Sequence, residues 1–453
     1  MFHTVKLSKS DPTPLYIQLA CELAKLIQTE LLCEGMKLPT IRLLSKQLSI
    51  NRDTVVSAYK LLEQQGLVES HIGRGTYIAP HTIQTNALAS STLSSKPRLC
   101  CSHLNLSHDF YPATLCQELS TRIIQEEGWE AFRDPLFRER HALRQSASAF
   151  LELLGLKVHF AQTRIVSSID TFLLSLFKLS PKIGICVESI RDLSTSCYLR
   201  SIGAKIYEVP LTSHGMDLDI LEKHLHTGTI SYIFVSSYLQ NPTGICYSEH
   251  NKKKLLELAS HYDAYIIEDG SYCDFLYDTP HYKPLYNLCN DGRVIYLYHF
   301  SKVYLPYMKY SFAILPSPLI KCFKDDIECS FNERFLHYYL ISNDLNHIRT
   351  HIRTTCKLRY QTLTAELNSL DDMLTYTSHW GGLSVWCHVP EIVYSDFCQA
   401  LATMGIIIAP SELFSTTSIK GYFRLSIGEL PTENINELIL ALKKCLRPIH
   451  TAL

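Results

Sequence analysis

The chain has 453 residues, of which 46% are hydrophobic and 19% are charged. That length is ample for two cores, and the composition is globular, which excludes a disordered chain. The formal net charge is −1, so any nucleic-acid partner must be inferred from local motifs and not from overall charge. No apolar run approaches the roughly 20 residues of a membrane span, and we therefore expect no membrane partner.

The 16 cysteines and 20 histidines show neither a CxxC pair nor the Cys/His spacing of a zinc site, so we predict no metal. The chain opens with Met-Phe-His-Thr-Val-Lys and shows no signal peptide. We therefore expect a cytoplasmic protein whose cysteines are reduced residues of the core.

The first part of the chain, residues 1–79, combines helical and alternating patterns. Helical patterns occur at residues 13–27, 39–48 and 51–66, and an alternating pattern follows at residues 68–78. Thr13-Pro14 is a favourable helix start, and Asn51 is a favourable cap for the third helix. The alternating stretch is interrupted at Gly73-Arg74-Gly75, as in a hairpin. Three helices and a hairpin predict a winged helix-turn-helix.

Polar residues of this segment suit contacts to double-stranded operator DNA. The candidates are Arg42, Lys46, Asn51, Arg52, Thr54 and Arg74. The third helix of such a fold enters the major groove by its N-terminal end, which places Arg52 and Thr54 at base edges and Asn51 near phosphate. The two basic residues of the second helix suit backbone contacts, and the arginine between the wing glycines can reach a minor groove. The segment resembles the GntR-type winged helix over roughly 65 residues.

Residues 80–108 are rich in Ser, Thr and Ala, and they follow neither the helical nor the strand period. A stretch of this kind buries little surface, so we interpret it as a linker between two domains. Its length would let the DNA-binding head reach the partner subunit of a dimer.

Residues 109–453 alternate short apolar runs with helical patterns. We predict buried strands at 183–187, 205–209, 232–235, 265–268, 294–298 and 312–315. Helices are predicted at 191–203 and 248–262. Such alternation indicates an α/β domain with a largely parallel sheet, whose ligand crevice lies at the carboxyl ends of the strands.

Three polar residues follow those strands and suit a pyridoxal 5'-phosphate (PLP) pocket. Such a pocket needs a lysine for the Schiff base and an acid that keeps the pyridinium nitrogen protonated. Lys302 supplies the lysine, and Asp269 supplies the acid. Asn241, in Asn-Pro-Thr-Gly, and Tyr272 supply donors to the ring oxygen.

These motifs resemble fold-type I aminotransferases over about 330 residues, and the whole chain resembles the MocR subfamily of GntR regulators. The resemblance implies an α/β fold: an N-terminal winged helix-turn-helix joined to a PLP-dependent aminotransferase-like domain, with a mostly parallel sheet and a small C-terminal α+β subdomain. It assigns Arg424 to the clamp for an amino-acid carboxylate, and Gly381-Gly382 to the pair before the small subdomain. It also implies a homodimer.

The phosphate cup departs from the family pattern. Its expected members are Ser168, His299, Ser301 and Lys309. Asp170 introduces a negative charge beside the phosphate unless it points away. No aromatic residue that could stack on the ring is present in residues 188–192. His299 stands where a serine is usual, and Lys309 replaces an arginine, which keeps the charge but loses the bidentate fork.

Three accounts of this pocket remain open: weakly bound PLP, a different B6 vitamer or amino-acid adduct, or a vestigial site. We favour a regulator that binds PLP reversibly and responds to an amine or amino-acid effector. The alternatives are a working aminotransferase with an appended DNA-binding head, and a DNA-binding repressor with a catalytically dead dimerisation core.

Overall fold

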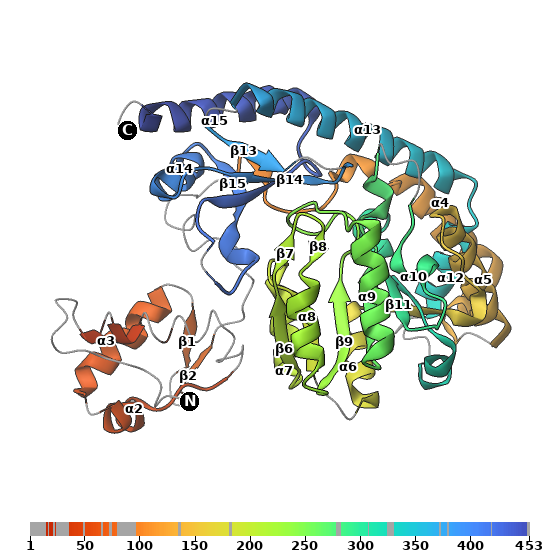
Figure 1. Ribbon diagram of the computed structural model, residues 1–453, viewed down its shortest axis with the longest axis horizontal. Helices are drawn as coiled ribbons and strands as arrows, with labels where there is room; N and C mark the ends of the chain where they lie inside the picture. Colours follow the sequence, from red (N-terminus) through yellow and green to blue (C-terminus); the bar gives the residue numbers. More distant parts are fainter. Residues whose placement is uncertain are drawn as a thin grey trace. The chain divides into compact units, whose positions relative to one another are not determined.

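The computed structural model describes residues 15–16, 18–20, 23, 36–78 and 97–450, with gaps at 49, 65–66, 72–74, 135–136, 181–183, 278–281, 307, 324–329, 371–372, 378–379 and 418. The chain divides into two compact units, Met1–Ser90 and Ser91–Leu453 (Figure 1). None of the helices in the described ranges is long and apolar enough to cross a membrane.

The first unit contains two complete helices followed by a hairpin. The elements are α2 (Ile41–Leu48), α3 (Arg52–Gln64), β1 (Val68–His71) and β2 (Gly75–Ile78). Thr40 Oγ1 accepts the N–H of Leu43 at 3.3 Å, and Asn51 Oδ1 accepts the N–H of Asp53 at 3.3 Å. These two side chains cap the helices, and the two strands pair antiparallel.

The core of this unit joins the two helices to the residues before them. Buried members come from each element: Leu19, Ala20, Leu23, Leu38, Leu44, Val55, Ala58, Tyr59, Leu62 and Val68. The Tyr59 hydroxyl donates to Pro39 O at 2.8 Å, and Lys37 bridges to Tyr77 beside the hairpin. The predicted winged helix-turn-helix is confirmed. Thr13-Pro14, Gly66 and Gly73-Arg74 lie outside the described residues.

A seven-stranded sheet forms the centre of the second unit, in the order β4-β12-β11-β10-β9-β5-β6. The strands are β4 (Thr163–Val166), β5 (Gly184–Glu188), β6 (Lys205–Val209), β9 (Ile230–Val235), β10 (Tyr265–Asp269), β11 (Val294–Tyr298) and β12 (Ser311–Ile314). The pairs from β6 to β11 are parallel, whereas β12 runs antiparallel to both β11 and β4. The mostly parallel sheet agrees with the prediction.

The sequence analysis missed β4. All four of its residues are buried, so the strand shows no alternation, and it includes Arg164. The Arg164 guanidinium donates to the carbonyl oxygens of Phe323 at 2.9 Å and Ile320 at 2.8 Å. These hydrogen bonds satisfy the buried charge of Arg164. A charged residue is unusual in a strand that is buried on both faces, so the sequence did not indicate a strand here.

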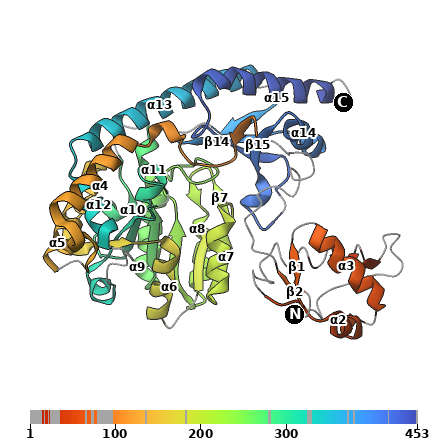
Figure 2. The same cartoon turned by 180° about the vertical axis from the view of Figure 1, so that it is seen from behind.

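Helices cover both faces of the sheet. Ile185 and Val187 pack on one face against α6 (Ile169–Leu179) and α7 (Leu193–Ser201). Cys186 points to the other face, which is covered by α8 (Leu218–Leu225), α9 (Glu249–His261) and α10 (Leu285–Leu288). Figure 1 shows α8 and α9 alongside the strands, and Figure 2 shows the unit from behind. A short hairpin, β7 (Leu211–Thr212) and β8 (Gly215–Met216), precedes α8.

A second core lies beside β11 and β12, under α4 (Ala113–Glu127), α5 (Phe137–Leu153) and α12 (Ser330–Leu340). Phe150 on α5 is 1% exposed and contacts a group of aromatic rings: Tyr298, Phe300, Tyr304 and Phe312. Because Phe300 begins the short helix α11 (Phe300–Val303), this packing holds the helix that carries Lys302.

The C-terminal subdomain is a five-stranded sheet in the order β13-β14-β16-β15-β3. Its strands are β13 (Thr375–Thr377), β14 (Ser384–His388), β16 (Tyr422–Ser426), β15 (Ile406–Pro410) and β3 (Leu99–Cys101). Helix α14 (Glu391–Thr403) packs beside β15, and the long helices α13 (Asp344–Leu367) and α15 (Ile435–His450) lie across this end of the unit (Figure 1).

The edge strand β3 corrects the predicted linker. Residues 97–108 belong to the second unit, because β3 pairs in parallel with β15 from Leu99↔Ile406 to Cys101↔Ile408. Leu99, Cys101 and Leu106 are buried in its core. A strand of three residues is too short to show an alternating pattern, and the Ser-, Thr- and Ala-rich composition of its neighbours indicated a linker instead.

Candidate functional site

The first unit brings three of the predicted DNA contacts into one groove. Arg42, Lys46 and Arg52 line a groove of about 460 Å³ over the turn between α2 and α3. All three side chains are exposed, and none of them pairs with a carboxylate of a described residue. Asn51 and Thr54 lie at the same N-terminal end of α3. Free cations beside a helix N-terminus suit a phosphate backbone.

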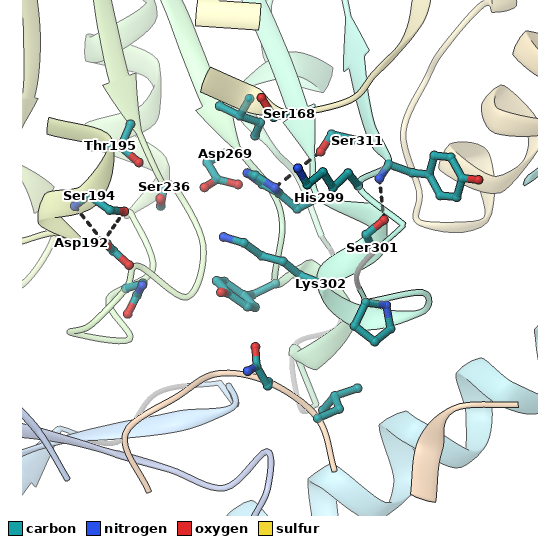
Figure 3. Close-up of a pocket in the computed structure, with 18 of the residues that line it drawn as sticks. Ser168, Asp192, Ser194, Thr195, Ser236, Asp269, His299, Ser301, Lys302 and Ser311 are labelled. Atoms are coloured by element: carbon teal, nitrogen blue, oxygen red, sulfur yellow. Dashed lines mark hydrogen bonds between the residues drawn. The ribbon is translucent and has the colours of Figure 1, made fainter. Parts of the chain in front are cut away.

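The second unit holds a cavity of about 910 Å³ at the carboxyl ends of the parallel strands. Eight predicted site residues line it: Ser168, Asn241, Asp269, Tyr272, His299, Ser301, Lys302 and Lys309. Figure 3 shows the Lys302 side chain extending into this cavity, with Asp269 and His299 near its amine. Arg424 does not line the cavity, but it donates a hydrogen bond to Asn241, which does line it.

Lys302 follows β11 and sits on α11, and its amine lies 5.8 Å from the centre of the Tyr272 ring. Its side chain is accessible through the cavity although protein atoms surround it. Burial alone would lower the pKa of this amine, but the nearby Tyr272, Asp269, Asp192 and Asp170 raise it above its usual value. The amine is therefore protonated at neutral pH in the free protein.

We expect a pH dependence from this raised pKa. Only the neutral amine attacks a carbonyl, so capture of pyridoxal by Lys302 becomes faster as the pH rises toward the lysine pKa. Asp192→Asn removes a charge that raises that pKa, and we expect several-fold faster capture at pH 7. Absorbance stopped-flow measures both effects. The exposed Asp219→Asn is the control, and equal rates for wild type and Asp192→Asn would contradict the expectation.

Asp269 ends β10, and one of its carboxylate oxygens is already occupied. Oδ1 accepts the N–H of Ser271 at 3.0 Å and also the Ser271 hydroxyl, which leaves Oδ2 available to a ligand. The intervening residue must be glycine, since a Cβ at Gly270 would lie 1.8 Å from the hydroxyl oxygen of buried Tyr296. The close approach of this ring to the backbone fixes the strand end that presents Asp269.

Arg424 on β16 is 6% exposed and contacts three separate segments of the second unit. Its Nη1 donates to Asn241 Oδ1, its Nη2 donates to Ser102 O, and its guanidinium carbon lies 4.8 Å from the centre of the Phe414 ring. Burial lowers the pKa of this arginine, against the opposing effect of Tyr272 and Asp192. The predicted carboxylate clamp and the ring-oxygen donor are thus in direct contact.

The predicted phosphate cup offers hydroxyls and little positive charge. Ser168 caps α6 by accepting the N–H of Thr171 at 3.0 Å, and Ser301 Oγ accepts the N–H of Tyr310 at 2.5 Å. Burial, together with the charge on Lys302, holds the pKa of His299 well below its usual value, so this imidazole is neutral. Lys309 remains as an exposed cation, at φ 52°.

Asp170 also lines the cavity and does not point away from it. Burial raises the pKa of its carboxyl, as does the neighbouring Asp192, while Lys302 lowers it. This departure was predicted from the sequence, whereas Arg191 and Asp192, which are among the other charged residues of the lining, were not. Both residues follow β5 and lie at the same edge of the sheet as the predicted site residues. Their position after a buried strand could have identified them as candidates for the lining.

The described residues contain no group of three or more His, Cys, Asp or Glu side chains that could hold a metal ion.

Two family models match the chain. Residues 15–78 match the bacterial regulatory proteins of the gntR family, and residues 166–442 match aminotransferase class I and II. The chain belongs to the class I and II aminotransferase family, and it joins that fold to a GntR helix-turn-helix domain. This combination is the MocR architecture, which the sequence analysis predicted from resemblance.

Relatives of two kinds match the chain, one over nearly its full length and one over the second unit's part of it. The uncharacterized HTH-type transcriptional regulator YdfD of Bacillus subtilis is 23% identical over 90% of this chain and 91% of its own length. Aromatic-amino-acid aminotransferase 1 of Thermococcus litoralis is 28% identical over 55% of this chain and 65% of its own. The crystal structure of Pyrococcus horikoshii kynurenine aminotransferase, in complex with PMP, superposes with a TM-score of 0.69 and 22% identity, covering 78% of this chain and 92% of that one.

Proposed function

We propose that the protein is a DNA-binding transcription regulator of the MocR type, which acts in the cytoplasm as a homodimer. Its second unit would sense PLP together with an amine or amino-acid effector. The observation that carries the proposal is the convergence of Lys302, Asp269, Asn241 and Tyr272 on one cavity, in a chain that also has a basic helix-turn-helix groove.

The donor set supports PLP as the cofactor. Asp269 Oδ2 is available to the pyridinium nitrogen, and Asn241 and Tyr272 can serve the ring oxygen. Ser168, Ser301 and Lys309 would hold the phosphate. When bound, PLP supplies an electron-withdrawing aldehyde that reacts with amines. With only one cation in the cup and Asp170 facing it, we expect the phosphate to be held less tightly than by an arginine fork.

The same four ring-binding residues would also serve an aminotransferase, and that remains the second candidate. Two features favour a regulator. Residues 188–192, after β5, contain no aromatic residue that could stack on the ring, and a neutral His299 lies in the cup. Neither residue supports tight retention of a cofactor through many turnovers.

The DNA-binding residues should differ in what they contribute. Arg52→Ala is expected to cost about 1–3 kcal/mol of operator binding and to relax the base preference, because Arg52 begins α3 and would read a base edge. Lys46→Ala should weaken binding to operator and random DNA alike, and should reduce the salt slope by about 1. Fluorescence anisotropy at several salt concentrations separates the two. Equal losses on both DNAs for Arg52→Ala would count against base reading.

Reciprocal coupling tests the sensing function. If an effector changes operator affinity by some factor, the operator must change effector affinity by the same factor, because both describe one thermodynamic cycle. We expect titrations of PLP-loaded protein with an amino acid, with and without operator, to give matching factors. Identical affinities in the presence and absence of operator would show that the cavity does not regulate DNA binding.

A further inference from the structure

The second unit has a further cavity that the proposed function does not use. It has a volume of about 420 Å³ and lies between α13, the end of α5 and the residues that follow Tyr272. We call it the α13 pocket, and its lining residues are Leu153, Leu154, Cys273, Asp274, Leu276, Tyr282, Asn346, Arg349, Thr350 and Arg353. None of these residues lines the cavity that contains Lys302.

One face of α13 supplies most of the polar groups of this pocket. Its four residues, Asn346, Arg349, Thr350 and Arg353, have the i, i+3, i+4, i+7 spacing that places side chains on one side of a helix. The rest of the lining is mostly apolar. Sites for small molecules commonly measure about 300–1,000 Å³ and combine an apolar lining with a few polar groups. The α13 pocket therefore has the size and composition of a site for a small amphiphilic molecule.

The carboxylate in this pocket is already occupied. Asp274 is the only acid among the described lining residues. Its Oδ2 accepts the hydroxyl of Tyr298 at 2.5 Å, and its Oδ1 accepts the hydroxyl of Tyr304 at 2.8 Å. Arg349 Nη2 lies 3.6 Å from Oδ1, which is too long for a hydrogen bond. The Arg349 side chain is 22% exposed, so its charge is only partly satisfied and is open to the pocket.

A second arginine adds to the positive charge. Arg353 donates to the backbone oxygens of Asp274 and Leu276, and it pairs with no carboxylate of a described residue. Two guanidinium groups and one carboxylate leave the described lining with a net charge of +1. Guanidinium groups match the planar geometry of a carboxylate. The polar side of the pocket therefore suits an anion.

We propose that the α13 pocket is a second ligand site, which binds a small carboxylate with an apolar group. The carboxylate would pair with Arg349 and Arg353, and the apolar group would lie against Leu154, Leu276 and Tyr282. A neutral ligand would leave the positive charge uncompensated, and an inorganic anion would leave the apolar lining in contact with water. This inference goes beyond the proposed function, because the pocket lies outside the cofactor cavity.

Asp274 connects the α13 pocket to Lys302. It accepts hydrogen bonds from Tyr298, which ends β11, and from Tyr304, which directly follows α11. Lys302 lies on α11, between these two anchors. A carboxylate that competes with Asp274 for Arg349 therefore acts on the residues that position Lys302. We expect occupancy of the pocket to change the affinity for PLP, and this link rests on the proposed function.

Calorimetric titration and thermal melting of the PLP-free full-length protein with benzoate test the site. Benzoate should bind and raise the melting temperature at concentrations at least about tenfold lower than neutral benzamide or inorganic phosphate, which has no apolar group. Arg349→Met should weaken benzoate binding at least about tenfold. Thr350→Phe should abolish binding by filling the pocket from an exposed position, and it remains informative if Arg349→Met does not fold. His347→Phe is the control, because His347 is exposed on α13 and does not line the pocket.

Absence of benzoate binding would overturn the inference, as would equal binding of benzoate and benzamide. Binding that is unchanged in Thr350→Phe would place benzoate elsewhere and would also overturn it. A PLP absorption titration at saturating benzoate measures the link to Lys302. We expect the half-saturating PLP concentration to shift at least about twofold in wild type and not in Thr350→Phe. No shift in wild type would overturn the link and leave the site standing. Absence of a PLP band alongside benzoate binding would instead overturn the proposed cofactor.

Discussion

Lys302→Ala is expected to abolish the visible absorption band that develops when PLP is added to the wild-type protein. The band requires a covalent bond between the PLP aldehyde and a neutral lysine amine, and Lys302 presents its amine to the cavity beside Asp269. Spectra recorded across a PLP titration measure the effect. The variant should lose the band at every concentration, and its operator affinity should no longer respond to PLP.

Lys309→Ala provides the matched control, because Lys309 also lines the cavity but belongs to the phosphate end. We expect this variant to keep the band and to require more PLP to reach it. A band of unchanged intensity in Lys302→Ala would mean that a different lysine reacts. If wild type shows no band either, the pocket has lost its chemistry and the regulator must respond to another signal.

Phe150→Ala should lower the free energy of unfolding of the second unit by about 3–5 kcal/mol. Phe150 is almost fully buried and contacts four other aromatic rings, at centroid distances from 5.1 to 6.1 Å. Truncation removes those contacts and leaves a cavity next to α11. Urea unfolding followed by near-UV circular dichroism reports the loss.

Leu153→Ala is the comparison for that experiment. Leu153 lies on the same helix but is 55% exposed, so a change within about 0.5 kcal/mol is expected. A loss of less than about 1 kcal/mol in Phe150→Ala would show that the aromatic cluster repacks around the missing ring. A weaker PLP band in folded Phe150→Ala would in addition show that the cluster positions Lys302.

The predicted site residues converge on one cavity because they follow buried strands of one parallel sheet. Asn241, Asp269 and Lys302 each come after an apolar run, and parallel strands bring such positions to one edge. The sequence does not give the direction of a side chain, so whether Asp170 faces the cavity was settled only by the structure. The sequence likewise does not show that Arg191, which follows β5, lines the cavity.

The limits of the fold prediction have a similar physical origin. Strand β4 is buried on both faces and contains an arginine, while β3 has only three residues, so neither shows an alternating pattern. Both are defined by pairing with strands far along the chain, β12 and β15. Long-range pairing leaves little local trace in a sequence, whereas helix caps such as Asn51 are local and could be predicted.

The hydrogen bond from Arg424 Nη2 to Ser102 O joins β16 to the chain segment that directly follows β3. With Arg424 as the carboxylate clamp, an arriving ligand competes for a donor that otherwise holds this carbonyl. Ser102 directly follows β3, the edge strand that anchors the segment to β15. A ligand carboxylate bound by Arg424 would therefore weaken a hydrogen bond that holds the chain segment after β3.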